Sequence, residues 1–412
     1  MSKPQSASSA LPMVRERNHL PFVPRVDLLC RDPDQARCPV SLSPDRARGR
    51  RSLGQAAVGT PFGRRIHALA LYLKTNQLFS YQRLQGVFCD LFGLDISQGA
   101  LMNMFKRSAP IFAARREDAL VALRRAQVVA CDETGMRIEG CSGYQWVFCA
   151  ADAVVHTAAF SRAAQVVRDA MAGHQPDVWI SDRYTAQQGH GLHHQTCLAH
   201  LDRKATFVEE HGTDLIGMRL KLWFDRAFGL ARDIATLAAS TVKRRRRALV
   251  RDLDAILGTA TDCELAHELL GQIRRARDQL LTFCDFPGKV DATNNVSERA
   301  LRPSVIQRKV TNGYRAKWAA DAEADLRTTA DTARLSGANP FNTIRGLSSN
   351  RTENLHKGYC HASSMPTALG SRNGRSSPRA TMSGMVKAYR PSMLMCRHAS
   401  GDRWATSSSR TS

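Results

Sequence analysis

The sequence lacks the features of membrane, secreted and disulfide-rich proteins. No apolar run approaches the roughly 20 residues that a helix needs to cross a bilayer, and the N-terminus has no hydrophobic signal core. The 11 cysteines include no Cys-x-x-Cys pair, which argues against a disulfide framework and for a reducing compartment. Several cysteines lie in apolar runs, where we interpret them as small core residues: Cys89, Cys131, Cys149 and Cys197. We therefore expect a cytoplasmic or nucleoid-associated protein with no membrane contact.

Acidic residues are also in short supply. The chain has 37 Asp and Glu against 59 Lys and Arg, which gives a formal net charge of +22. This imbalance favours a polyanionic partner, and the alternative is a basic surface that is simply solvated. The 412 residues, 43% of them hydrophobic, suffice for two or three domains with a sizeable core.

Apolar periodicity is missing at both ends of the chain. Residues 1–60 and 346–412 are basic and rich in Ser and Arg, and we predict that they form a disordered arm and a disordered tail. Residues 61–125 have a helical pattern instead. Ser80 and Ser97 are candidate N-caps and Gly93 is a candidate helix stop, which gives the outline of a helix-turn-helix.

The second helix of that outline is apolar where a DNA-reading helix would need polar groups. The apolar residues are Leu101, Met102, Met104 and Phe105. We therefore favour packing against the rest of the protein over base recognition for this helix. A separate charged helix is expected at about residues 115–125.

Residues 126–213 change to a pattern of short apolar strands. The order is an antiparallel meander, a helix that stops near Gly173, and two more strands. The strands are expected at Val128–Ile138, Tyr144–Ala151, Val154–Phe160, Val178–Ser181 and His194–Leu198. This order predicts an α/β fold with a ribonuclease-H-like mixed sheet flanked by helices. Residues 214–289 have helical spacing throughout and predict an all-helical insertion, after which residues 290–345 complete the core.

Three acidic residues stand out against this background. Asp132 lies on the first strand, Asp182 follows the fourth strand, and Glu298 lies in a later helical segment. In the predicted sheet the two strands are neighbours, so the aspartates can converge. Three carboxylates can hold two divalent ions that activate an attacking oxygen and stabilise a leaving one in phosphoryl transfer. We predict Asp132, Asp182 and Glu298 as both catalytic residues and metal ligands.

Each acidic residue also has a structural interpretation. A carboxylate at the end of a strand can simply cap a turn, and Glu298 can form an ion pair with Arg302, four residues later on the same helical face. Glu133 is adjacent to Asp132 and points to the opposite face of the strand, so it is left out of the site. Cys197 and His200 have no second pair nearby, so we interpret them as a core cysteine beside a polar histidine that can face the site.

Several sequence blocks, taken in order, resemble transposases of the bacterial insertion sequence 66 family, within the DDE superfamily. The resemblance covers about residues 61–344. Its blocks are Tyr81-Gln-Arg-Leu-Gln-Gly, Asp95-Ile-Ser-Gln-Gly-Ala-Leu, Cys131-Asp-Glu-Thr-Gly, Trp179-Ile-Ser-Asp-Arg-Tyr, Gln195-Thr-Cys-Leu-Ala-His-Leu-Asp-Arg-Lys, Asn294-Asn-Val-Ser-Glu-Arg-Ala-Leu-Arg-Pro and Gln307-Arg-Lys-Val-Thr-Asn-Gly.

The resemblance implies a catalytic triad, which falls on Asp132, Asp182 and Glu298. It also implies two Mg²⁺ (or Mn²⁺) ions and DNA strand cleavage followed by strand transfer. The implied partner is double-stranded DNA, both the transposon ends and the target. We expect a homo-oligomer on that DNA, and a need for accessory proteins stays open.

The chain also departs from the family. Family members usually carry a Cys-rich zinc-binding region before the core, whereas Cys30 and Cys38 are isolated here and cannot supply four ligands. The tail differs from the family's end as well. Two alternatives therefore stay open: a decayed transposase that binds DNA without cutting it, and a ribonuclease-H-like nuclease with a cellular role.

Basic residues near the blocks are candidates for contacts with DNA phosphates. A run of five consecutive cations, residues 243–247, repels itself unless a polyanion is near. The alternative for all of them is a solvated basic face. The predicted DNA-binding residues are Arg203, Lys204, Lys243, Arg244, Arg245, Arg302, Arg308 and Lys309.

Overall fold

The computed structural model describes residues 62–349 of the chain. The predicted arm at 1–60 lies outside these residues, and so does the predicted tail at 346–412 except for residues 346–349, which are helical and not disordered. Within residues 62–349, no helix combines the length and the apolar character needed to cross a membrane.

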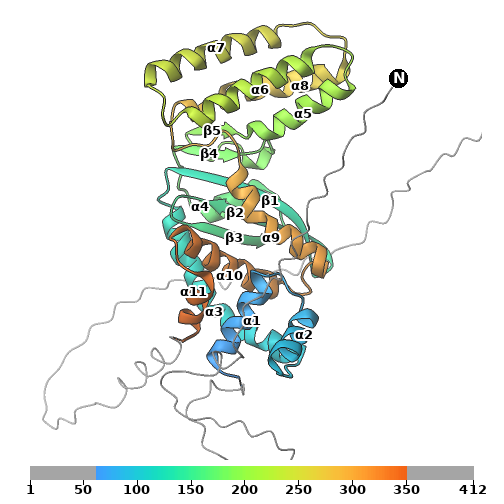
Figure 1. The fold of residues 1–412 in the computed structure, drawn as a ribbon, viewed down its shortest axis with the longest axis vertical. Coiled ribbons are helices and arrows are strands. Elements are labelled where there is room, and N and C mark those ends of the chain that lie inside the picture. The colour runs from blue at the N-terminus through green and yellow to red at the C-terminus, as the bar shows by residue number, and fades with distance from the viewer. Residues whose placement is uncertain (1–61, 350–412) are drawn as a thin grey trace, which may run out of the picture. The chain divides into compact units, whose positions relative to one another are not determined.

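A five-stranded mixed sheet forms the centre of the described part (Figure 1). Its strand order is β3-β2-β1-β4-β5. The first three strands form an antiparallel meander, while β4 and β5 run parallel to β1. The strands are β1 (Val128–Ile138), β2 (Cys141–Cys149), β3 (Val154–Ala159), β4 (Val178–Ser181) and β5 (His193–Thr196). The predicted mixed sheet, and the adjacency of the first and fourth strands, are confirmed.

Both faces of the sheet are buried, because alternate residues of each strand pack against helices on opposite sides. Ala130 and Ile180 join the core formed with α5 (Leu198–His211), the inserted helices and α9 (Asn295–Thr311). Val129 and Trp179 join the core on the other face. That second core includes residues of α3 (Gln98–Leu123) and α4 (Ala164–Met171).

The N-terminal helices begin and end where the sequence signals predict. Ser80 Oγ accepts the backbone N–H of Arg83 at the start of α2 (Tyr81–Phe92), at 3.2 Å. Ser97 Oγ accepts the N–H of Ala100 in the same way at the start of α3. Gly93 ends α2 with φ +62°, a conformation that glycine adopts without strain. The first helix, α1, spans Arg64–Thr75.

Two expectations for this region are wrong. The separate helix expected at 115–125 is the second half of α3, a 26-residue helix that contains Pro110. Buried residues recur along its whole length, including Leu101, Phe112 and Leu123, so tertiary packing offsets the missing hydrogen bond at the proline. Cys89, interpreted as a core residue, is exposed.

Packing of the second helix is confirmed, since Leu101, Met104 and Phe105 are buried. Met102 is the exception, with 41% of its surface exposed. Its neighbours on the buried face meet α1 and α2 in the core of the helical region. These apolar side chains are therefore unavailable for base contacts.

The segment between the two parts of the sheet core is helical, as predicted. After α5 come α6 (Ile216–Asp233), α7 (Ala239–Leu257) and α8 (Glu264–Ala276). Trp223 is buried among them and donates its indole N–H to the Leu249 carbonyl at 2.8 Å. The helices share one continuous core with Ala130 and Ile180 of the sheet, so they lie directly against it.

The chain then returns to the sheet. In Figure 1, α9 crosses one face of the sheet, and α10 (Lys317–Leu335) runs along β3. Both helices lie within residues 290–345, the segment predicted to complete the core. A last helix, α11 (Pro340–Ser349), was not expected, and it packs with α1 through Ile344 and Phe341.

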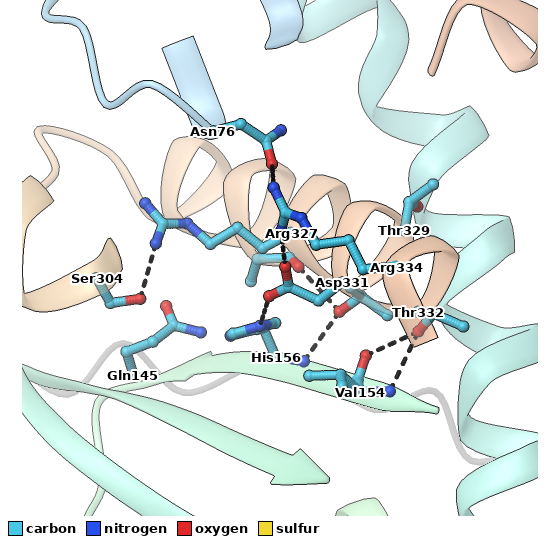
Figure 2. Close-up of polar contacts among 12 residues, drawn as sticks. Asn76, Gln145, Val154, His156, Ser304, Arg327, Thr329, Asp331, Thr332 and Arg334 are labelled. Atoms are coloured by element: carbon cyan, nitrogen blue, oxygen red, sulfur yellow. Dashed lines mark hydrogen bonds and ion pairs between the residues drawn. The ribbon is translucent and has the colours of Figure 1, made fainter. Parts of the chain in front are cut away.

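A layer of polar contacts joins α10 to β3 and to the helices around it (Figure 2). His156 Nε2 lies 2.8 Å from Asp331 Oδ2, and the His156 N–H donates to Thr328 Oγ1 at 2.9 Å. Glu323 accepts Lys74 Nζ at 3.2 Å and Arg327 Nη2 at 2.6 Å. This layer links α1, α10 and the sheet through paired charges.

Candidate active site

Two aspartates lie just beyond the paired part of neighbouring parallel strands, Asp132 within β1 and Asp182 directly after β4. β1 and β4 pair up to Ala130 and Ile180, and Asp132 and Asp182 each follow two residues later. Because alternate side chains on a strand share a face, both carboxylates lie on the face that Ala130 and Ile180 present to α9. Each is anchored by a backbone N–H: Glu133 donates to Asp132 at 2.9 Å and Tyr184 donates to Asp182 at 2.8 Å.

The charges around Asp132 are of one sign. The pKa of the Asp132 carboxyl is raised to about 7, mainly by burial and further by the charges of Glu133, Asp182 and Glu298. The N–H of Glu133 acts in the opposite direction and does not cancel this. Within residues 62–349, neither Asp132 nor Asp182 forms an ion pair with a basic side chain. Such a group of carboxylates is unfavourable unless a cation balances it.

Glu298 comes from the first turn of α9 and belongs to the same group, since its charge raises the pKa of Asp132. Its Oε1 lies 3.6 Å from His200 Nδ1 and 3.5 Å from Arg203 Nη2. In the described part of the chain, no ion pair joins it to Arg302, so that alternative finds no support here. Folding thus brings together three carboxylates separated by 166 positions of sequence (298 − 132).

The buried Asn294 connects the elements that carry these residues. Its side-chain N–H donates to the Cys131 carbonyl, directly before Asp132, at 2.9 Å. Its backbone N–H donates to Cys197 Sγ at 3.1 Å, and its carbonyl accepts Ser297 Oγ at 3.0 Å. This one residue, through its side chain and its backbone, therefore links β1, the start of α5 and the start of α9.

Glu133 points away from this group, as strand alternation predicts. Its side chain is buried and pairs with Arg162, whose Nη2 lies 2.7 Å from Oε1, and it also accepts a hydrogen bond from Gln187. Arg162 stacks over the Tyr184 ring at 3.7 Å from the ring centre. Glu133 thus forms an ion pair with a basic side chain, which Asp132 does not do within residues 62–349.

Cys197 and His200 lie at the start of α5, beside Glu298. The ligand atoms of the three residues all lie within 4.8 Å of one another. Burial raises the pKa of the Cys197 thiol, and the backbone N–H groups that bond to its sulfur lower it. The sequence presented Cys197 and His200 as an isolated pair, because their third partner comes from a helix almost 100 residues later.

The predicted DNA-binding residues lie in several separate places. Arg203 and Arg302 are exposed and lie near Glu298, the first through its ion pair and the second one helical turn along α9. Lys204 is exposed and donates to Gln272 at 2.6 Å. Lys309 is also exposed and lines a surface pocket with residues of α2, including Arg83.

Arg308 lies elsewhere. Its guanidinium is partly buried and donates to the Gly135 carbonyl and to Thr134 Oγ1 on β1. It therefore holds α9 against the sheet, and that hydrogen bonding leaves less of the group available to a phosphate. No sequence signal predicts the inward position of Arg308, because a basic residue in a helix is ordinarily expected to be exposed.

The basic run lies on α7, in the inserted helices. Lys243 and Arg244 are exposed, and within residues 62–349 they form no ion pair. Arg245 lies 3.6 Å from Asp233, and Arg246 lies 3.2 Å from Asp285. The structure does not bring this run to the carboxylates.

Two residues that position the site were missed from the sequence: Asn294 and Arg162. Asn294 precedes Glu298 in a polar stretch, and an asparagine next to a helix start suggests a local cap, not a link between three elements. Arg162 has no sequence signal, since only the fold places it over Glu133.

Comparisons with known proteins place the chain in a family. No curated protein matches it significantly. A family model described as Transposase IS66 family matches residues 59–322, more than half of the chain. That span begins before α1 and extends into α10, so it contains the whole sheet and all three carboxylates. The chain belongs to the IS66 family of transposases.

Proposed function

We propose that the protein is a DDE transposase that cleaves DNA at the ends of an insertion sequence and joins the freed strand to a target. The observation that carries this is the group formed by Asp132, Asp182 and Glu298, which lies just beyond the parallel pairing of β1 with β4 and, among residues 62–349, has no ion-paired cation at the aspartates. The strand order, with β1 central and β4 beside it, supports a ribonuclease-H-like description of the core.

The donor set fits hard divalent ions such as Mg²⁺ or Mn²⁺. Three carboxylates supply oxygen ligands, and such ions prefer oxygen and retain water. Burial, and then the charges of neighbouring acids, raise the pKa of Asp132, so a bound cation would be favoured here. Asp132, whose pKa responds to the charges of both other carboxylates, would hold the ions together with Asp182 and Glu298. Two bound ions would activate the attacking oxygen and stabilise the leaving one.

The residues of the chain fix the geometry that this chemistry needs. The N–H groups of Glu133 and Tyr184 orient the two aspartates, and Asn294 fixes the start of α9 against β1. Arg203 lies beside Glu298 and can neutralise a phosphate next to it. We expect water to attack first and a DNA 3′-hydroxyl to attack in strand transfer.

The DNA is proposed to run from the carboxylates along the exposed side of α9. Arg302 and Lys309 lie on that side, and Lys309 shares a pocket with Arg83. The run on α7 would hold a different stretch of DNA. We propose residues 214–289 as an insertion that carries this second contact, and a homo-oligomer as the form that joins two ends.

Nicking of DNA that carries the element's own ends tests the proposal. With Mg²⁺ present, the parent chain is expected to nick this DNA, and Glu298→Gln is expected to lower nicking by at least about a thousandfold. Binding of the same DNA should persist, because it rests on Lys and Arg. A matched control is Glu117→Gln, an exposed carboxylate on α3, which should nick like the parent.

Two outcomes would contradict the proposal in different ways. A parent chain that binds the ends but does not cut them, with either metal, matches the decayed remnant. A parent chain that cuts DNA without regard to the ends matches a nuclease. Equal nicking by the Glu298→Gln variant would remove Glu298 from the site.

A further inference from the structure

A second set of ligand atoms shares Glu298 with the carboxylate group. Cys197, His200 and Glu298 offer one sulfur, one imidazole nitrogen and one carboxylate oxygen, all within 4.8 Å of one another. Cys197 is the residue before α5 and His200 lies three residues later, so both point to the same side of the helix start. Glu298 reaches this side from α9.

Two of these atoms have no hydrogen bond, although Glu298 Oε1 also lies 3.5 Å from Arg203 Nη2. His200 Nδ1 and Glu298 Oε1 are each shielded from solvent and have no hydrogen bond, although they lie 3.6 Å apart. Buried polar atoms are nearly always paired, and an exception calls for a ligand that completes them. The two side chains as a whole are still open on one side, with 37% and 29% exposure, so an ion can reach them.

The hydrogen bonds of the Cys197 sulfur are also compatible with metal binding. Cys197 is buried, and its Sγ accepts N–H groups from Asn294, Ala199 and His200. A metal-bound thiolate keeps the capacity to accept such bonds, and outer hydrogen bonds of this kind hold ligands in place. The Asn294 bond, at 3.1 Å, ties the sulfur to the same junction that fixes Asp132.

The donor types select the ion. Sulfur, nitrogen and oxygen together suit Zn²⁺, whereas Mg²⁺ takes oxygen alone. Ligand atoms around tetrahedral zinc are about 3.3 to 3.7 Å apart, given bond lengths of about 2.0 to 2.3 Å. Rotation of the partly exposed His200 and Glu298 side chains would bring the ligand atoms from their present separations, all within 4.8 Å, to this tetrahedral spacing. Water would fill the fourth position.

We propose that Cys197, His200 and Glu298 form a binding site for Zn²⁺ or a similar borderline divalent ion, and that this site competes with the carboxylate site for Glu298. Zn²⁺ bound here withdraws one ligand from the cleavage site, so it inhibits cleavage reversibly. The competition rests on the proposed function, whereas uptake of the metal does not.

Cobalt absorbance tests the site without DNA and without activity. The metal-stripped full chain is titrated with Co²⁺, which replaces Zn²⁺ and gives a near-ultraviolet charge-transfer band only when a thiolate binds it. One equivalent of Co²⁺ is expected to produce the band, and Zn²⁺ is expected to abolish it. Cys197→Ser should remove the band while the serine still accepts the backbone N–H groups.

Matched variants separate this site from other ligands. His200→Gln and Glu298→Gln should weaken Co²⁺ binding by at least about tenfold, while Cys89→Ser and Asp132→Asn should leave it within about twofold. Cys89 is an exposed cysteine and represents adventitious binding. Asp132 represents the carboxylate site. The proposal is overturned if the parent gives no band, if Cys89→Ser removes it, or if Asp132→Asn weakens it as much as Glu298→Gln.

Zinc inhibition of nicking tests the competition. Half-inhibition of the Cys197→Ser variant should need at least about tenfold more Zn²⁺ than the parent. Equal sensitivity would overturn the competition. A parent that shows the cobalt band but never nicks DNA contradicts the proposed function and leaves the metal site intact, so the two failures are distinguishable.

Discussion

Buried carboxylates occur in two regions of this molecule with opposite electrostatics. On β1, the pKa of Asp132 is raised to about 7 by burial and by other acids. On the buried side of α10, burial would also raise the pKa of Glu323, but Lys74 and Arg327 hold that pKa below its ordinary value. Asp331 is held low in the same way, mainly by its hydrogen bond with His156 (Figure 2).

The difference separates carboxylates that stabilise the fold from carboxylates that the fold must tolerate. Glu323 satisfies two buried cations, so removing its charge leaves them unpaired. Asp132 satisfies no cation, so removing its charge relieves repulsion. Groups that are costly to the free protein are characteristic of functional sites. Mutations in the two regions should therefore have opposite effects on activity and stability.

The largest effect is expected at Asp132. Asp132→Asn should lower metal-dependent nicking by at least about a thousandfold, because one of the three proposed metal-binding carboxylates is lost. Its free energy of unfolding in chelator should equal or exceed that of the parent, because an amide carries no charge to bury. Single-turnover nicking and urea unfolding measure the two quantities. A loss of more than about 1 kcal/mol of stability would assign Asp132 to the structural class.

Glu323 should behave in the opposite way. Glu323→Gln leaves Lys74 and Arg327 buried without a counter-charge, and breaking such a pair costs about 3 to 5 kcal/mol. Urea unfolding measures this. The exposed Glu117, which pairs with the partly buried Arg116, gives the control, since Glu117→Gln should change stability by no more than about 0.5 kcal/mol. Similar losses in both variants would mean that burial of the Glu323 network is not what makes it stabilising.

A smaller effect is expected from His194 on β5, which is partly buried and lies 3.2 Å from Ser181 Oγ. Burial, with help from Arg183 and His190, lowers the pKa of His194 to about 4. The unfolded chain therefore binds this proton first as pH falls below about 6.5, so the folded state loses stability between about pH 6.5 and 4. From pH 7 to 5 the loss from this group is about 2 kcal/mol.

The variant His194→Gln isolates that contribution. Urea unfolding of parent and variant at pH 7 and pH 5 gives the difference, and the variant should lose less stability than the parent over this range. Other groups titrate in both chains, including Asp325, whose pKa is raised to about 6 by burial, and they cancel in the comparison. Parallel losses in the two chains would show that His194 is not held neutral by the fold.

Much of the sheet and of the carboxylate group was predictable, because both depend on local patterns. Alternating apolar residues locate β1 and β4, and the parallel pairing of these strands follows from their order. Ser80, Ser97 and Gly93 give helix ends by local hydrogen bonding and backbone conformation. These signals act within a few residues, which is why a single sequence carries them.

The parts that were missed depend on contacts between distant segments. α3 continues through Pro110 because its buried face packs along its length. Arg308 points inward because it donates a hydrogen bond to the Gly135 carbonyl on β1. Cys197 and His200 have Glu298 as a third neighbour only because α9 packs beside the start of α5. None of these partners is near in sequence. Periodicity locates an element, but it does not say which side chains from elsewhere will meet it.

The smallest effects are expected on α7, whose exposed side chains are positively charged, in contrast to the acidic group around Asp132. Lys243, Arg244 and Arg247 are exposed and, within residues 62–349, unpaired. If DNA lies along this helix, each replacement by Gln removes about one phosphate contact. That lowers the slope of log affinity against log salt by about 0.9 and weakens binding by about fivefold at 0.15 M salt.

Affinity for duplex DNA over a salt series measures both quantities, and an internal control comes from the same run. Arg246 already pairs with Asp285 at 3.2 Å, so Arg246→Gln should change the slope less than Arg244→Gln does. Nicking per bound DNA should stay near the parent value for all of these variants, because the run lies away from the carboxylates. A slope that is unchanged when all three unpaired residues are replaced would place the DNA elsewhere, and α7 would then be a solvated basic face.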